Sequence, residues 1–547
     1  MPIMDTEDQE NSEATQSNRP RGHRYWLPIG IGLLVGAGIV WVQWRPDLDR
    51  NIKAWLSLAA GLLGSVLILL WFVFLSRFRW SFRLSIVALL VLAVVGGRQL
   101  VRVDGTTDGR GLPRLVWRWT EPSVAAIGAP TNAPASVTSA VAAPSNAKDV
   151  PQFLGPNRDG LMTGVGLGRD WTSSPPRELW RQAIGQGWSA FSVVGGRAYT
   201  QEQRGEDECV TCYELVTGKL LWSYANRERF SQWQAGDGPH ATPTVDRGRV
   251  YAYGAKGHLV CLEAGTGQRV WSRSVLTENQ LENLEWGTSA APLLTEDLVV
   301  VTGGQTRGPT VLAYRRSDGE MQWKSGTDRA SYASPILATL AGRSAILSFN
   351  AGTLTAHDPK TGEEILNQKW GLDGPPKAAQ PVVVGGDRVL VTAGYGMGCE
   401  LFQVSAEADG KLKLTSVWKN SRLKAQFNSV AVREGHFYGL DDGLLACVSV
   451  ANGERKWKDG RYGSGQSLIV DDLVVVQSES GAVILAEAKP YGFRELGRVA
   501  ALSSKTWNFP TVAGRYLLAR NDREAVCYEL PMGESASVGS NSPGPKP

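Results

Sequence analysis

Two of the six cysteines, Cys209 and Cys212, form a Cys-x-x-Cys pair, a spacing used by many zinc sites and dithiol redox centres. Their neighbours predict an extended strand, on which residues three apart point to opposite faces, so the two thiols are poorly placed to share a metal. The five histidines are scattered, and no nucleophile elbow, zinc-protease motif or phosphate-binding loop is present. Hydrolysis through a nucleophile and nucleotide chemistry therefore have no support, and we predict no catalytic residue and no metal ligand.

The cysteines instead fit a repeated pattern. Six residues before a recurrent glycine, the chain has either cysteine or alanine. These residues are Cys212, Cys261, Ala313, Ala356, Cys447 and Cys527. We interpret the position as buried and structural, and we expect no disulfides within the set.

The pattern belongs to a segment of about 45 residues that recurs in the C-terminal two thirds of the chain, a period typical of propeller blades. The clearest copy, Ala241 to Trp271, consists of short predicted strands, including Arg249 to Tyr253 and His258 to Glu263, separated by turn glycines. A glycine in the last hairpin supplies the positive φ that a tight turn needs. It recurs at Gly218, Gly267, Gly319, Gly362, Gly410 and Gly453.

A large aromatic side chain follows the turn glycine. In four units tryptophan stands four residues later, at Trp222, Trp271, Trp323 and Trp457. Leu366 takes this place in the fourth unit, and an insertion delays the tryptophan to Trp418 in the fifth. We expect these side chains to lie on the outer strand and to pack over the neighbouring blade.

Two further copies, Ser467 to Leu485 and Pro510 to Leu530, keep only the first strands of the unit. A lone outer strand, Glu178 to Ala183, precedes the first complete copy, and the last copy lacks one. Pairing these two ends would complete an eighth blade and remove an open sheet edge. We therefore predict an all-β, eight-bladed propeller of four-stranded blades over residues 150–531.

The units CLEAGTGQRVW, AYRRSDGEMQW and CVSVANGERKW resemble the repeats of the pyrroloquinoline-quinone (PQQ) type propeller family. The opening FLGPNRDGLMTGVGLGRDW is similar to the first segment of bacterial envelope proteins of this class. The same repeats serve quinone-dependent (quinoprotein) dehydrogenases, the outer-membrane assembly factor BamB and extracellular sensor domains. The resemblance therefore implies the fold and not one activity.

Three stretches near the N-terminus are nearly free of charge: residues 26–44, 54–75 and 80–97. The first two reach the ~20 apolar residues that cross a bilayer, and the third does so if the helix begins near Trp80 or if Arg83 snorkels. We predict three spans in a membrane region of residues 25–98, after a short cytoplasmic tail of residues 1–24, with two spans as the alternative. Basic residues are balanced on both sides, so charge does not decide the orientation. The resemblance implies a propeller on the periplasmic side of the bacterial inner membrane.

Residues 99–149 are predicted to be a juxtamembrane segment followed by a flexible linker. Glu121 to Asp149 is rich in Ala, Pro, Ser and Thr and cannot bury a core, and residues 532–547 form a similar disordered tail. Leu112 to Trp119 mixes basic and aromatic residues, which suits either the lipid headgroups or a short strand. The net charge of +4 is spread out, so nucleic acid is not an expected partner.

The position just before each first strand should lie at one mouth of the propeller channel. Five of the eight units place an aromatic residue or histidine there: Trp188, His240, Tyr332, Phe427 and Trp507. The neutral polar residues Gln466 and Asn508 adjoin this ring. We predict that the ring stacks on a flat or sugar-like ligand, and the alternative is that it only plugs the channel.

The turns between second and third strands are expected on the same face and carry both signs of charge. Their polar residues are Gln201, Glu202, Arg204, Asp441, Asp442, Arg520 and Asp522. The acids could accept hydrogen bonds or hold a cation, and the arginines could bind a carboxylate. For Asp441 and Asp442 a simple turn role is the alternative.

Quinone-dependent members of the family carry, as the resemblance implies, adjacent cysteines beside the cofactor, acidic and amide ligands for calcium, and a catalytic aspartate. This sequence has no adjacent cysteine pair and no acidic motif that matches those ligands. We therefore favour a membrane-anchored scaffold that binds a protein, peptide or glycan of the envelope without a cofactor. The alternatives are an alcohol or sugar dehydrogenase that uses PQQ and calcium, and a ligand sensor coupled to the membrane helices.

Overall fold

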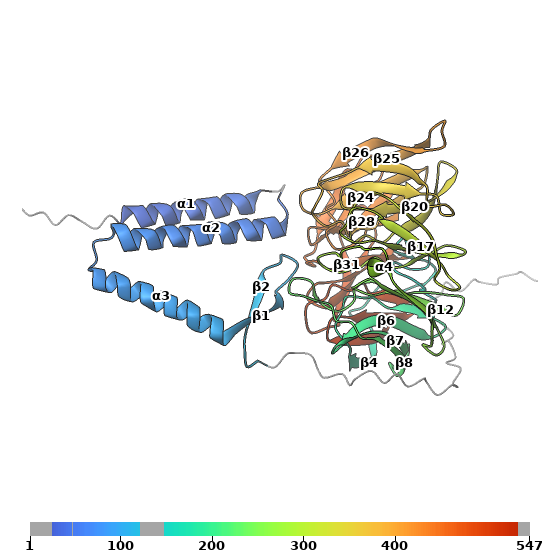
Figure 1. Ribbon diagram of the computed structural model, residues 1–547, viewed down its shortest axis with the longest axis horizontal. Coiled ribbons are helices and arrows are strands. Elements are labelled where there is room, and N and C mark those ends of the chain that lie inside the picture. Colours follow the sequence, from blue (N-terminus) through green and yellow to red (C-terminus); the bar gives the residue numbers. More distant parts are fainter. Residues whose placement is uncertain (1–24, 46–47, 121–146, 534–547) are drawn as a thin grey trace, which may run out of the picture. The chain divides into compact units, whose positions relative to one another are not determined.

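The computed structural model describes residues 25–45, 48–120 and 147–533, which form two compact units (Figure 1). One unit contains residues 25–45 and 55–99, and the other contains residues 48–54 and all described residues from 100 onward. The predicted cytoplasmic tail, most of the predicted linker and most of the predicted C-terminal tail lie outside the described residues.

The first unit consists of helices that are long and apolar enough to cross a membrane. They are α1 (Trp26–Trp44), α2 (Arg50–Leu70) with its π-helical continuation η1 (Trp71–Leu75), and α3 (Trp80–Leu100). Arg83 of α3 donates hydrogen bonds to the carbonyl oxygens of Phe78 and Val73, at 2.8 Å each. Its charge is therefore satisfied within the unit, and the prediction of three such helices is confirmed.

The second unit is an eight-bladed propeller, as predicted (Figure 1). In this architecture the blades surround a central channel, and the first strand of a blade lines it. Blades 1 to 4 are β5 (Ser192–Val194), β6 (Arg197–Arg204), β7 (Asp207–Glu214) and β8 (Leu220–Asn226); β11 (Thr244–Asp246), β12 (Arg249–Tyr253), β13 (His258–Glu263) and β14 (Arg269–Ser274); β15 (Leu293–Leu294), β16 (Leu298–Thr302), β17 (Val311–Arg315) and β18 (Met321–Ser325); β19 (Ile336–Leu340), β20 (Arg343–Phe349), β21 (Thr353–His357) and β22 (Glu364–Lys369).

The remaining blades follow the same antiparallel order. Blades 5 to 8 are β23 (Val382–Val384), β24 (Arg388–Ala393), β25 (Gly398–Ala406) and β26 (Leu412–Asn420); β27 (Ala431–Arg433), β28 (His436–Asp441), β29 (Leu444–Ser449) and β30 (Arg455–Asp459); β31 (Gln466–Val470), β32 (Leu473–Gln477), β33 (Ala482–Glu487) and β34 (Glu495–Ala500), with β3 (Leu161–Met162) added inside β31; β35 (Thr511–Ala513), β36 (Tyr516–Arg520), β37 (Glu524–Glu529) and β4 (Arg177–Ala183). Outside the blades lie the pair β1 (Val101–Thr106) and β2 (Pro113–Trp117), the pair β9 (Ser231–Gln232) and β10 (Gly236–Asp237), and α4 (Val275–Glu278).

The ring closes as the sequence predicts. The early strand β4 pairs antiparallel with β37, and Trp180 lies opposite Cys527. The N-terminal strand thus completes the C-terminal blade. Apolar side chains pack between adjacent sheets, and the largest cluster joins β4 and blades 7, 8 and 1. One local expectation is wrong: the QEQR segment is not a turn, because β6 continues through Arg204 and the turn comes at Gly205.

The repeated tryptophan, small residue and glycine form one interlocking contact between blades. Within blade 2 the Trp271 side chain lies opposite the small Cys261. Its indole N–H donates to the Arg316 carbonyl of blade 3 at 2.9 Å. A Cβ added to Gly319 would lie 2.5 Å from the same ring. The same indole bond to the next blade is made by Trp180, Trp222, Trp323, Trp418 and Trp457. The predicted packing of tryptophans over neighbouring blades is confirmed.

All six cysteines are buried and none forms a disulfide. Burial raises the pKa of both Cys209 and Cys212 to about 12. The structural interpretation of the Cys-x-x-Cys pair is therefore confirmed.

We predict that Gly319→Ala destabilises the propeller more than the matched change Gly342→Ala. Both glycines have positive φ, 71° and 77°, but the space around Gly342 is open whereas Gly319 contacts Trp271. Gly342→Ala should lower the free energy of unfolding by about 1–2 kcal/mol through backbone strain alone. Gly319→Ala should cost about 1–3 kcal/mol more through overpacking. Denaturant unfolding of the full chain measures both, and equal losses would contradict the proposed role of the indole contact.

Candidate binding face of the propeller

Three of the five predicted ring residues form one aromatic cluster. The ring of Trp507 lies 5.0 Å from that of Trp188 and 5.9 Å from that of Phe427, measured between centroids. The ammonium group of Lys505 lies 4.1 Å from the Trp507 centroid and 5.4 Å from that of Trp188. Burial lowers the pKa of Lys505 to about 8. The aromatic cluster, defined here as Trp188, Phe427 and Trp507, is thus a cation-bearing platform.

The other two ring residues pair with different aromatic partners. His240 meets Phe230 edge to face at 6.0 Å, and Tyr332 lies 5.4 Å from Trp286. Burial lowers the pKa of His240 to about 4, so the imidazole is neutral at pH 7. The predicted ring therefore consists of three separate aromatic groups.

Hydrogen bonds hold these positions around one axis. The Trp188 N–H donates to the carbonyl of Pro239, next to His240, at 2.9 Å. Asn508 donates from its side-chain amide to the Ser189 carbonyl, and Gln466 donates to the carbonyls of Phe427 and Trp507. Gln466 and Asn508 lie where the sequence predicts, but their amide N–H groups bind neighbouring blades.

The predicted charged residues of blades 1 and 8 are buried in a network of their own. Glu202 accepts hydrogen bonds from Arg204 at 2.9 Å and from Tyr213 at 2.8 Å. Burial alone would raise the pKa of Glu202, but Arg204 and Arg520 hold it below its ordinary value. Arg520, fully buried, donates to Thr200, Gln201 and Gly185 and so ties blade 8 to blade 1.

Two further members of the predicted set, Gln201 and Asp522, also lie among protein groups. Gln201 donates its side-chain amide to the Ala241 carbonyl at 2.7 Å. Asp522 lies 3.7 Å from Arg523, and burial raises the pKa of its carboxyl. Neither residue is part of the aromatic cluster.

The β1–β2 hairpin reaches the mouth of the channel at this face. Lys505 donates to the hydroxyl of Thr106 at 3.0 Å, and that hydroxyl donates to the Gln234 carbonyl. The Gly109 N–H donates to Glu479, whose carboxylate also accepts the indole N–H of Trp507 at 2.8 Å. The hairpin therefore uses the same groups that would meet a ligand over the aromatic cluster. For Leu112 to Trp119, the strand interpretation holds over β2.

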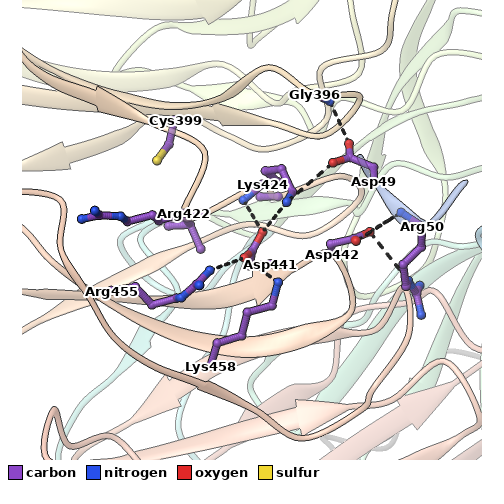
Figure 2. A network of polar contacts seen from close by, with 12 residues as sticks. Asp49, Arg50, Gly396, Cys399, Arg422, Lys424, Asp441, Asp442, Arg455 and Lys458 are labelled. Atoms are coloured by element: carbon purple, nitrogen blue, oxygen red, sulfur yellow. Dashed lines mark hydrogen bonds and ion pairs between the residues drawn. The ribbon is translucent and has the colours of Figure 1, made fainter. Parts of the chain in front are cut away.

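A second segment, residues 48–54, contains the end of the α1–α2 connection and the first residues of α2, and it docks on blades 5 and 6 (Figure 2). The buried Lys424 ammonium lies 3.7 Å from Asp49 and 3.6 Å from Asp441. Asp441, fully buried, also binds Lys458 at 2.7 Å and Arg455 at 3.5 Å. Asp49 accepts the backbone N–H of Gly396 at 2.9 Å. Asp441 is thus committed to cations of the chain itself.

The Asp442 side chain binds the first residue of α2. Its two carboxylate oxygens accept the backbone N–H of Arg50 at 3.0 and 3.1 Å, where the first turn of a helix lacks partners of its own (Figure 2). Burial raises the pKa of Asp442 above its ordinary value. The turn interpretation is correct for its backbone, which has φ of 51°, but the side chain forms a helix cap.

Glu208 is a buried acid that sequence reasoning missed. It lies at the start of β7 and accepts the backbone N–H of Ala255 at 2.9 Å. Burial raises its pKa to about 7. No periodic signal marks this residue, because its environment comes from the loop of the next blade.

The donor set of this face does not fit a calcium-bound quinone. Among the described residues, no group of three or more His, Cys, Asp or Glu is placed to hold a metal ion. The acids at the channel mouth and on blade 6, Glu479, Asp441 and Asp442, are bound to Trp507, to lysines and to Arg50. No step of a reaction is therefore assigned to such a cofactor.

A family model described as outer membrane protein assembly factor BamB matches residues 175–284, 231–459 and 350–506. These matches cover more than half of the chain. The chain belongs to this family. No protein of curated function matches the sequence.

Solved structures share the propeller. BamB from Moraxella catarrhalis matches with a TM-score of 0.50 and 17% identity over 65% of this chain and 100% of its own. The quinohemoprotein alcohol dehydrogenase from Comamonas testosteroni matches with a TM-score of 0.49 and 12% identity over 72% of this chain and 82% of its own. At 17% identity the likeness to BamB shows the fold alone.

We predict that Glu208→Gln reduces the pH dependence of stability. A carboxyl whose pKa rises to about 7 on folding stabilises the protein below about pH 4.5, and this stabilisation is lost as pH rises toward 7. The loss should be about 3 kcal/mol. Unfolding of wild type and Glu208→Gln between pH 5 and 8 measures it, with the exposed Glu206→Gln as control. Equal pH slopes for wild type and Glu208→Gln would contradict the prediction.

We predict that Asp442→Ala loosens the start of α2, because it removes the acceptor of the Arg50 N–H. Amide hydrogen exchange around Arg50 should become about tenfold faster, as expected for a lost cap. Asp442→Asn is the matched control, since asparagine keeps an acceptor and tolerates positive φ. Identical exchange in both variants, or equally faster exchange in the β1–β2 hairpin, would show that Asp442 does not act as a cap.

Proposed function

We propose that this protein is a membrane-anchored scaffold of the bacterial cell envelope, whose propeller binds a protein, peptide or glycan on the extracytoplasmic side. The observation that carries the proposal concerns the charged side chains on the face of the aromatic cluster and on blade 6. These acids and cations bind one another and two segments of the chain, residues 48–54 and the β1–β2 hairpin. Such a face holds an anchor in place, because these charged side chains bind the chain itself.

The docked segments also support three spans. Residues 48–54 include the end of the α1–α2 connection and the start of α2, and the hairpin follows α3 directly in sequence. Only an odd number of spans places the loop after the first span and the segment after the last span on the same side. Because both segments contact the propeller, three spans with the N-terminus inside is the topology we propose.

The first test asks whether the protein is an oxidoreductase. Purified full-length protein is mixed with PQQ and calcium, and quinone absorbance and dye-linked oxidation of alcohols and sugars are recorded. We expect neither stoichiometric uptake nor turnover. Tight uptake with turnover would defeat the scaffold proposal.

The second test asks whether a partner uses the aromatic cluster. Cross-linking in envelope membranes compares wild type with Trp188→Ala, Trp507→Ala and the control Tyr491→Ala, whose side chain is 94% exposed. We expect a partner that all four proteins retain, since the hairpin occupies the mouth beside the cluster. Loss of the partner in the two tryptophan variants alone would assign binding to the aromatic cluster. Absence of any partner of the wild type would contradict the proposal.

A further inference from the structure

The ring positions precede the first strands, so these strands run from the ring toward the other mouth of the channel. Residues 150–162 cross the first strands and bind several blades. Val150 pairs with Val193 of blade 1, and Pro151 accepts the N–H of Val245 of blade 2. In blade 7, Leu161 and Met162 form β3, which runs parallel to β31. Among blades 3 to 6, the segment binds blade 3 through the Arg158 guanidinium and blade 5 through the Arg158 carbonyl and Gln380, and it leaves the middle of β19 in blade 4 exposed.

A cavity of about 370 Å³ lies between the crossing segment and these four blades. Aliphatic side chains of β15, β19, β23 and β27 line it, together with polar residues that include Arg158, Asp159 and Gln380. Leu337, in the middle of β19, is 43% exposed although it belongs to an innermost strand. The volume is within the range of about 300–1,000 Å³ that small-ligand pockets occupy.

The wall of the cavity also has backbone and side-chain groups that lack a hydrogen-bond partner. Among the described residues, β19 is the end strand of its sheet, so its inner edge has no strand partner. Gln380 and Arg158 line the cavity and are more than nine-tenths buried. The Gln380 amide oxygen and the Arg158 Nε have no hydrogen-bond partner there. An occupant that offers both N–H donors and C=O acceptors would satisfy these groups, whereas a purely apolar occupant would not.

In blade 7, an extended segment of the chain already pairs with the inner edge of a first strand. There β3 adds to the inner edge of β31, with Leu161 opposite Ile469 and Met162 opposite Val470. The Ile469 N–H donates to Gly160 and the Asp471 N–H donates to Met162, each at 2.8 Å. The chain thus already binds one extended aliphatic segment inside a blade of this ring.

We propose that the cavity binds a short extended aliphatic peptide of a partner protein, which adds to the inner edge of β19 as β3 adds to β31. The peptide backbone supplies the donors and acceptors, and its side chains contact Leu337 and the aliphatic wall. This inference rests on the proposed binding function and names its ligand class. It places the partner at the mouth that the anchor segments leave free.

The test uses the full chain in lipid nanodiscs and a fluorescent peptide pool, Gly-X-X-X-Gly amide with X drawn from Val, Ile and Leu. We expect saturable binding and slower hydrogen exchange of β19 when peptide is bound. Exchange of β31 should not change, since β3 already covers its inner edge. Leu337→Asp should weaken binding about tenfold or more. Val270→Asp, at a 38% exposed position on β14, is the matched control and should change binding less than twofold.

Two comparison probes distinguish a strand-forming peptide from an occupant held only by apolar contacts. A pool with alternate N-methylated residues cannot form strand hydrogen bonds and should bind about tenfold more weakly or not at all. Dodecanoate should not displace the peptide. Equal binding of the N-methylated pool, displacement by dodecanoate, or absence of saturable binding would each overturn the strand-addition proposal. The cross-linking test of the scaffold does not depend on any of these results.

Discussion

The contact between each outer-strand tryptophan and the next blade is the interaction on which the rest of the structure depends. In six blades the indole N–H reaches a carbonyl of the following blade. Where a turn glycine lies under the ring, as at Gly319 beneath Trp271, no larger residue would fit without displacement. Since six of the eight blades are fixed to the following blade in this way, their inner strands are held at set positions around the channel. These tryptophan contacts therefore also determine the geometry of both mouths of the channel.

The two mouths of the channel differ in the charge of their side chains. At the mouth with the aromatic cluster, buried charges such as Lys424 and Asp441 need partners, because an unpaired charge in a protein interior is costly. They find them in one another and in Asp49 of the segment before α2. The docking of that segment is therefore part of the charge balance of blade 6. The cavity beside blades 3 to 6 combines aliphatic and polar walls with the free edge of β19, which suits a ligand recognised through its backbone.

The sequence predicts the fold well because the fold is repetitive. The spacing from Cys261 to Gly267 to Trp271 recurs, and each recurrence reports the same local environment, so blade number and closure through β4 follow from counting. Contacts between segments that occur once carry no such signal. The capping of Arg50 by Asp442, separated by 392 residues, and the binding of Gly109 to Glu479 could not be found in this way. The five candidate ring positions form three separate aromatic groups, and the contacts of the β1–β2 hairpin with Lys505 and Glu479 were not foreseen.

The burial of all six thiols has a practical consequence for work on this protein. Burial raises the pKa of Cys261 and Cys447 to about 11 and that of Cys399 to about 12, so very little thiolate exists at neutral pH. Aqueous maleimides and spin-label reagents should therefore not react with the cysteines of the native chain. A single cysteine introduced on the surface would then report alone, without prior removal of the natural ones.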